Sequence, residues 1–370
     1  MGRTEITVEK GSIFAYRVFD LGNEINLEKA EALLRSQGDV STFDLRTFSR
    51  SLMISTPPLA LSLKPWQETI QEMSWEVVPL LKIWSFGSIS VRLCIEFEQS
   101  LNLEKLCDIS NYLENNSDFH GVTVERIKEI FNILKPAIEK PGFWDQYEDY
   151  LFFHFEKATE EITDLKSALC GDGISSLILG EKYMRFSEQI NQSVASTTFQ
   201  YETNDLLLIH WNGAILFDPQ IDHNIIHSIE FALCQLLELR YYDNLLDQQL
   251  EQLYHRIEHS GRTILTNPYR ELCRKAALEY IDISEIVDRV GNAIKVVGDF
   301  YYATIFRAAT ERFQIPVWRK IVDHKLSNLA EVSTLFQGEI NEKRNQLLEI
   351  IIIILIAIEV IPFVYNLAMN

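Results

Sequence analysis

Strand-like and helix-like hydrophobic patterns alternate along the first third of the chain. Residues 12–19 and 88–97 are rich in aromatic and β-branched side chains, which is typical of strands. Each stretch is followed by the tetrapeptide Asn-Leu-Glu-Lys, at 26–29 and at 102–105, which opens a predicted helix each time, and Asn26 is predicted to cap the first of these helices. The recurrence predicts two related strand–helix halves packed side by side, although four matching residues also recur by chance. Residues 123–139 then have helical spacing.

The middle of the chain carries the clearest β pattern. Asn204-Asp205 and Asn212-Gly213 separate short apolar runs, and Asn-Gly is a favoured hairpin turn because both residues tolerate positive φ. A three-stranded antiparallel meander is therefore predicted, with strands at 197–203, 206–211 and 214–217. Residues 221–258 contain neither Gly nor Pro and have helical spacing, which predicts one long helix or a slightly broken pair.

The last quarter is predicted to be almost entirely helical. A periodic stretch at 283–313 precedes Pro316, which stands where a first-turn proline belongs. Along the following helix, apolar residues recur at alternating steps of four and three, and this spacing predicts a coiled-coil seam. Two of the seam positions are polar, Ser333 and Lys343. The seam positions are Val322, Leu326, Leu329, Ser333, Phe336, Ile340, Lys343 and Leu347. An antiparallel hairpin with the preceding helix would bury this seam within one chain, and self-association would bury it between chains.

Residues 347–369 are mostly apolar and predict a C-terminal transmembrane helix, because about 20 such residues cross a bilayer. A central acidic residue, Glu359, makes insertion marginal. Lys343 and Arg344 would hold the bulk of the chain on the cytoplasmic or matrix side. The residues predicted to specify the membrane helix or an oligomer are Glu349, Ile350, Ile354, Glu359 and Pro362. The alternative is a helix buried as the shared core of a soluble oligomer.

These patterns together predict an α+β fold. N-terminal strand–helix α/β units are followed by a central antiparallel meander, and a long coiled-coil-like helical hairpin then ends in the transmembrane helix. The predicted domains are an N-terminal α/β domain (1–160), the meander with its long helix (161–282), the helical hairpin (283–346) and the transmembrane helix (347–369).

Charge and cysteine content narrow the function classes. The formal net charge is −19 and no basic run interrupts the acidic background, so strong direct nucleic-acid binding is not expected. The five cysteines are scattered and never spaced as CxxC, which argues against a disulfide framework and a structural zinc site. No cofactor is predicted.

Two histidine patterns could carry metal chemistry. His255, Glu258 and His259 form an HxxEH motif, in which two histidines one helical turn apart bind zinc and the glutamate serves as general base. The motif lies at a helix end and lacks a third ligand at family spacing, so histidines that interact with the helix dipole are the favoured interpretation. His223, His227 and Glu230 also share one helix face, where capping or surface roles are commoner than metal binding.

The hairpin at 206–218, the helix at 229–246 and the segment 318–360 together resemble the RMD1/YagE family, also called DUF155. Leu348-Glu349 and Ile358-Glu359 occupy the places of the apolar helix that is distinctive of that family. The resemblance implies a membrane-anchored, self-associating protein without established catalytic residues. The predicted function is therefore a non-enzymatic scaffold or assembly factor that binds membrane lipid through its C-terminal helix and unknown protein partners through its body. The alternatives are a metal-dependent hydrolase that uses the HxxEH motif, and a soluble oligomer.

Overall fold

The computed structural model describes most of the chain. The described residues are 6–42, 52–54, 56–158, 172–182, 184–202, 204–259, 274, 277–278, 280–281, 283–288, 294–296 and 300–368. The chain divides into two compact units, each built from two segments. Unit 1 comprises Met1–Tyr241 and Ile286–Trp318, and unit 2 comprises Tyr242–Glu285 and Arg319–Asn370.

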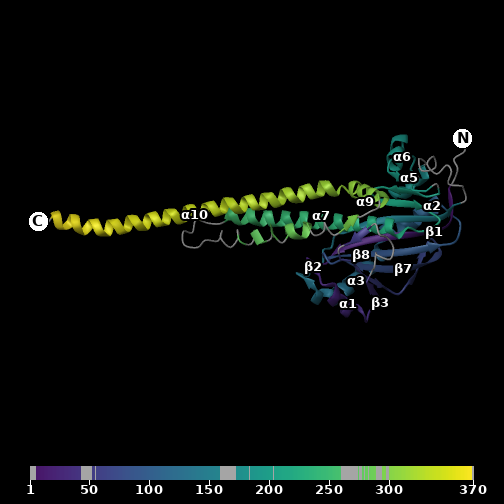
Figure 1. Cartoon of the computed structure of the whole chain (residues 1–370), viewed down its shortest axis with the longest axis horizontal. Coiled ribbons are helices and arrows are strands. Elements are labelled where there is room, and N and C mark those ends of the chain that lie inside the picture. Colours follow the sequence, from purple (N-terminus) through teal and green to yellow (C-terminus); the bar gives the residue numbers. More distant parts are fainter. Residues whose placement is uncertain are drawn as a thin grey trace. The chain divides into compact units, whose positions relative to one another are not determined.

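A large, mostly antiparallel sheet forms the centre of unit 1. Its strand order is β12-β13-β14-β11-β1-β8-β7-β5-β3, with β6 paired to β7 and β9 paired to β1, and the central strands β1, β8 and β7 lie side by side (Figure 1). The strands are β1 (Thr7–Asp20), β3 (Asp39–Thr42), β5 (Leu59–Ser62), β6 (Trp66–Ile70), β7 (Met73–Ile83), β8 (Ser88–Phe97), β9 (Leu101–Asn102), β11 (Tyr147–Ala158), β12 (Thr198–Phe199), β13 (Leu206–Ile209) and β14 (Gly213–Phe217). Among the described strands, only β11 and β14 pair in parallel.

Short strands and helices complete the described elements. Two small ladders pair β2 (Glu24–Ile25) with β10 (Ile138–Glu139), and β4 (Leu52–Ile54) with β15 (Ile294–Val296). The helices are α1 (Leu27–Leu34), α2 (Leu103–Asn115), α3 (Ser117–Leu134), the 3₁₀ turn η2 (Lys135–Ala137), α5 (Asp172–Leu179), α6 (Glu188–Ala195), α7 (His223–His259), α9 (Phe300–Arg312) and α10 (Ile315–Ala368).

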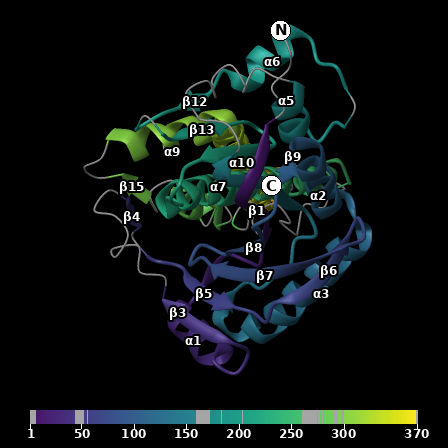
Figure 2. The same cartoon turned by 90° about the vertical axis from the view of Figure 1, so that its right-hand side faces the viewer.

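The alternation of side chains along β1 and β8 gives the sheet two different faces. Ile13, Ala15 and Phe19 point into the main hydrophobic core, which helices α1, α2 and α3 cover. Side chains on the opposite face of β1 and β8 meet the first half of α7, and Figure 2 shows α1 and α3 on one side of the sheet and α7 on the other. The α7 face is unusual because a row of polar side chains is buried along it.

Several local predictions are confirmed. The side-chain oxygens of Asn26 and Asn102 accept the backbone N–H groups of Lys29 and Lys105 at 2.9 and 3.0 Å. Asn26 therefore caps its helix as predicted, and Asn102 caps the helix that was predicted to begin there. The predicted strand at 88–97 is β8, and the predicted meander is β12-β13-β14. The helix predicted at 221–258 is the single helix α7.

The predicted fold class needs correction at the meander. It was predicted as an element separate from the N-terminal strand–helix units, but β14 joins β11 in parallel, so the meander extends the sheet that starts in the first residues. The fold is therefore mixed α/β around one large, antiparallel-dominated sheet. A contact between strands so far apart in the chain leaves no local pattern in the sequence. The predicted domain boundaries remain predictions.

Unit 2 contains the second half of α7 and nearly all of α10. The ammonium nitrogen of Lys325 lies 2.5 Å from Asp243 Oδ1 and 2.6 Å from Asp247 Oδ1, which places α10 beside α7. The first three positions of the predicted seam, Val322, Leu326 and Leu329, are buried. Leu347, at the end of the seam, is 37% exposed.

The predicted C-terminal transmembrane helix, and with it the predicted single-pass membrane localisation, is wrong. The predicted contact with membrane lipid stays a prediction. Over the described residues, no helix is long and apolar enough to cross a membrane. The physical reason lies in Glu349 and Glu359: the uninterrupted apolar run between them, residues 350–358, is about half of the ~20 residues that a bilayer requires.

Candidate functional site

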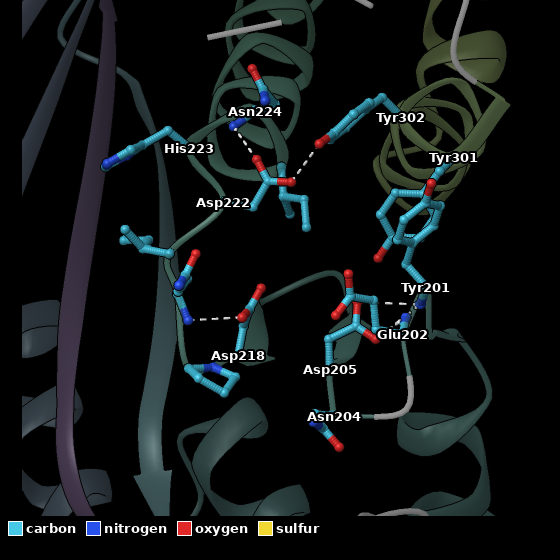
Figure 3. Close-up of a pocket in the computed structure, with 14 residues that line it drawn as sticks. Tyr201, Glu202, Asn204, Asp205, Asp218, Asp222, His223, Asn224, Tyr301 and Tyr302 are labelled. Carbon is cyan, nitrogen blue, oxygen red and sulfur yellow. Dashed lines mark hydrogen bonds between the residues drawn. The ribbon is translucent and has the colours of Figure 1, made fainter.

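A polar pocket of about 630 Å³ lies in unit 1, where three segments converge. The segments are the link between β12 and β13, the connection from β14 to α7, and the start of α9. This is the end of the sheet at which the parallel strands β11 and β14 finish and a helix begins, the usual place for ligands in α/β proteins. Figure 3 shows the side chains of Asp205, Asp218, Asp222 and the tyrosines around this space.

Aspartates organise the loops that build the pocket. Asp205, which is 8% exposed, accepts the backbone N–H groups of Tyr201 and Glu202 at 2.9 and 2.8 Å. Asp218 follows β14 directly and accepts the backbone N–H of Gln220 at 2.8 Å. These bonds fix the turns locally, because a short side-chain carboxylate satisfies backbone donors that the sheet leaves unpaired.

Asp222 connects α7 to α9. Its Oδ1 accepts the backbone N–H of Asn224 at 2.9 Å, which caps the first turn of α7. Its Oδ2 accepts the hydroxyl of Tyr302 at 2.6 Å, as Figure 3 shows. One carboxylate therefore holds the start of the helix and one wall of the pocket together.

Three tyrosines form the aromatic wall. The ring centroids of Tyr201 and Tyr301 lie 4.7 Å apart, and those of Tyr301 and Tyr302 lie 5.7 Å apart. Burial raises the pKa of Tyr301, and the carboxylates of Asp205 and Asp222 raise it further. The phenol therefore stays protonated at neutral pH and can donate a hydrogen bond.

The pocket carries a concentrated negative charge. Its described lining includes four carboxylates and neither lysine nor arginine: Glu202, Asp205, Asp218 and Asp222. Burial raises the pKa of Asp218, and the charges of Asp205 and Asp222 add to that rise. His223, also in the lining, has a lowered pKa because of burial and the positive charges of Arg92 and Lys82, so its imidazole is neutral.

The second predicted histidine pattern leads from this pocket to a buried ionic cluster. The ring of His223 stacks on that of His227 with centroids 6.0 Å apart. His227 Nδ1 lies 2.9 Å from the ammonium nitrogen of Lys82, and Lys82 also forms an ion pair with Glu230. The cation held by His227 and Glu230 is thus Lys82 of β7. Within the described part of the chain, no group of three His, Cys, Asp or Glu residues is placed to hold a metal.

The other predicted site residues are not brought into this pocket. The HxxEH motif occupies the last turn of α7, where His255 is exposed and the side chains of Glu258 and His259 lie outside the description. Glu349, Ile350 and Ile354 are exposed on α10. The side chains of Lys343, Arg344, Glu359 and Pro362 also lie outside the description, so the roles given to these residues stay predictions.

Sequence reasoning missed the pocket aspartates, although one signal was present. Asp218 and Asp222 stand between a buried strand and the start of a helix, the segment where α/β proteins place ligand-binding groups. The contribution of Tyr301 and Tyr302 left no such signal, because α9 joins the pocket from about 80 residues further along the chain.

The fold and pocket define a mixed α/β protein with an acidic pocket of the kind that binds small ligands. The chain belongs to the family described as "Uncharacterized protein MJ0711, N-terminal domain", which matches residues 10–223. It is 24% identical over 266 residues to uncharacterized protein MJ0711 of Methanocaldococcus jannaschii, an alignment that covers 72% of this chain and 79% of the relative. No solved structure matches the chain.

Proposed function

We propose that the protein binds a small organic cation, such as an alkylammonium ion, in the acidic pocket. The observation that carries the proposal is the presence of four carboxylates around one space whose described lining holds no cationic side chain. The electrostatic potential of such a pocket attracts a cation and repels phosphate or carboxylate ligands. The volume of about 630 Å³ suits a small organic molecule.

The aromatic wall favours an organic cation over a bare metal ion. Ammonium groups bind favourably against tyrosine faces as well as to carboxylates, and the rings of Tyr201, Tyr301 and Tyr302 stand beside the aspartates. The carboxylates of Asp205 and Asp222 each accept backbone N–H groups, and these bonds hold their oxygens in fixed positions. The lone pairs that remain on these oxygens can accept N–H groups of a ligand. The N–H groups of a protonated amine can donate hydrogen bonds to these carboxylate oxygens.

The test is isothermal titration of the full chain with spermidine, repeated with Asp222→Asn. Asparagine caps a helix as well as aspartate does, so this variant removes the charge and keeps the capping oxygen. We expect the affinity to fall about tenfold, since a charged hydrogen bond contributes roughly 1.5–3 kcal/mol. Asp218→Asn should also lower the affinity for spermidine.

Asp118→Asn is the matched control, because Asp118 is exposed in the first turn of α3 and does not line the pocket. It changes the net charge by the same amount. Equal weakening by Asp118→Asn and Asp222→Asn would mean that spermidine merely follows the net charge of −19, and the pocket proposal would be abandoned. Absence of any heat of binding to the unmodified chain would have the same consequence.

Self-association is a second candidate function, favoured by the apolar residues of α10. Twelve large apolar side chains between residues 347 and 361 are 37–65% exposed, around the whole circumference of the helix. A helix that is apolar all round is buried in its working state. The resemblance to the RMD1/YagE family also implies self-association. We propose both that the chain is a divergent member of that family and that it self-associates. A solution mass of two or more times the 42.9 kDa of one chain in sedimentation velocity would support an oligomer.

A further inference from the structure

A second cleft, of about 340 Å³, opens at the edge of the sheet in unit 1. Its walls come from the end of α2, the start of β11, the turn between β13 and β14, and the middle of α7. The cleft exists because β14 pairs with β11 only from Leu151 to Phe155. Among the described strands, none pairs with the first residues of β11 on that side, where Trp211 and Asn212 line the cleft.

The cleft has a hydrophobic floor and an aromatic rim. Leu233 and Leu236 of α7 and Phe313 line it and are each at most 2% exposed. Trp211 is 44% exposed, and its ring meets Phe313 edge-on with centroids 6.3 Å apart. One indole face is thus held in place beside the cleft while much of its surface remains open to a ligand.

Ionisable groups in the cleft offset one another. Burial raises the pKa of Glu148 to about 7 despite its hydrogen-bonded ion pair with Arg240. Burial and the nearby Asp149 raise the pKa of Glu114 to about 7, against the opposing charge of Arg17. At neutral pH the cleft therefore holds partly protonated carboxyls and one guanidinium. An anionic ligand would face three acidic side chains, and a cation would face Arg240.

The polar groups of the cleft suit hydroxyl groups. Carboxyls accept from hydroxyls, the guanidinium donates to them, and the amides of Asn115 and Asn212 can do both. A hydroxyl is both donor and acceptor, so it can bond to any of these groups without bringing a charge. The exposed indole adds a flat apolar face, which matches the C–H face of a saturated ring.

We propose that this cleft is a second ligand site, which binds a neutral polyhydroxylated ring, a sugar or a cyclitol, stacked on Trp211. The volume of about 340 Å³ accommodates one such ring, and Trp211, which lines the cleft, is 44% exposed. The proposal is independent of the cation site, because no residue lines both pockets.

Saturation-transfer NMR on the full chain tests it with glucose, ribose, myo-inositol and glucose 6-phosphate as probes. At least one neutral probe should receive saturation at millimolar concentration, and glucose 6-phosphate should bind more weakly than glucose. Trp211→Ala should reduce the affinity about tenfold or more, equivalent to about 1.4 kcal/mol, while Trp211→Phe should retain much of it. Unchanged thermal unfolding midpoints would show that both variants fold.

If Trp211→Ala does not fold, Asn115→Ala serves instead, because Asn115 is exposed at the end of α2 and its side chain lines the cleft. It should also weaken binding. The proposal is overturned if no neutral probe binds, if glucose 6-phosphate binds more tightly than glucose, or if neither variant changes the affinity. Spermidine titration reports separately on the acidic pocket, so failure of one site is distinguishable from failure of the other.

Discussion

At the scale of single residues, the carboxyl groups of Asp20 and Glu238 are an unusual pair. Asp20 ends β1 and Glu238 lies on α7, and they are 0% and 1% exposed. Burial raises the pKa of both groups well above their ordinary values, and the charge of Asp20 raises that of Glu238 further. Two carboxylates cannot both ionise in such a place without a large free-energy cost, so the folded protein retains protons here.

This pair predicts a stability that declines with rising pH. A carboxyl whose pKa is raised in the folded state stabilises that state fully below its unfolded pKa of about 4, and this contribution is lost as pH rises toward the folded pKa. Glu238→Gln removes one ionisable group and keeps a hydrogen-bond donor for Asp20. We expect the variant to be more stable than the unmodified chain at pH 8, with a smaller difference at pH 4.

Urea unfolding at both pH values measures the effect, and Glu28→Gln, an exposed site on α1, is the control. The interpretation fails if Glu238→Gln destabilises the protein equally at pH 4 and pH 8, because the carboxyl would then act only by packing.

Residue-scale features were predictable only where they are local. Asn26 was identified as a cap because a cap depends on residues within one turn of the chain. Asp20, Glu238 and Lys82 gave no signal, because each is defined by a partner on another element. His227 and Glu230 were noticed as one helix face, but the sequence could not show that a lysine of β7 fills the place of the metal.

At the scale of elements, the buried ion pair between Lys82 and Glu230 fixes α7 on the sheet. The two side chains are 2% and 1% exposed, and Ser90 of β8 donates its hydroxyl to Glu230 Oε1 at 2.6 Å. Burial lowers the pKa of Lys82. Although burial acts in the opposite direction, the charge of Lys82 lowers the pKa of Glu230 overall. Removal of one partner would leave the other as an uncompensated buried charge.

Glu230→Gln should therefore lower the unfolding free energy by about 3–5 kcal/mol. The double variant Lys82→Met, Glu230→Gln should recover most of that loss, because neither charge remains and the glutamine oxygen still accepts from Ser90. Denaturant unfolding of the two single variants and the double variant forms a double-mutant cycle. Additive losses in the cycle would contradict the role given to the pair.

Individual helices and strands were easier to predict from the sequence than the pairing of the strands. The helix at 223–259 and the strand at 88–97 were found because their periodicities persist over many residues. The register of β1 against β8 and β11, and the parallel contact of β11 with β14, depend on side chains distant in sequence. The acidic pocket depends on that contact, so its aspartates were visible as turn residues but not as a site.

At the scale of the whole molecule, each compact unit is assembled from two separate segments of chain. Domains defined as consecutive stretches of sequence cannot describe such units, because the chain leaves unit 1 within α7 and returns to it before α10. The apolar stretch at 347–369 was recognised from the sequence, but a bilayer was predicted to cover it. Its uninterrupted length, between Glu349 and Glu359, was the feature that argued against that interpretation.

The exposed apolar residues of α10 lead to a prediction about assembly. Burial of a fully exposed Ile or Leu side chain contributes about 1.5–3 kcal/mol. Twelve side chains that are about half exposed therefore offer on the order of 10 kcal/mol per chain as an upper estimate. That is enough to hold copies of the chain together at micromolar concentration.

A truncation that ends at Asn345 removes these residues and leaves unit 1 unchanged in sequence. We expect the full chain to form an oligomer and the truncated chain to be monomeric in sedimentation velocity. Spermidine affinity should be the same for both, because every residue that lines the acidic pocket belongs to unit 1. Ile352→Glu and Ile356→Glu in the full chain should act like the truncation, since a charge at either position would be buried in the assembled state. An oligomer that survives both the truncation and these substitutions would place the interface elsewhere on the chain, and the exposed isoleucines would then have no role in assembly.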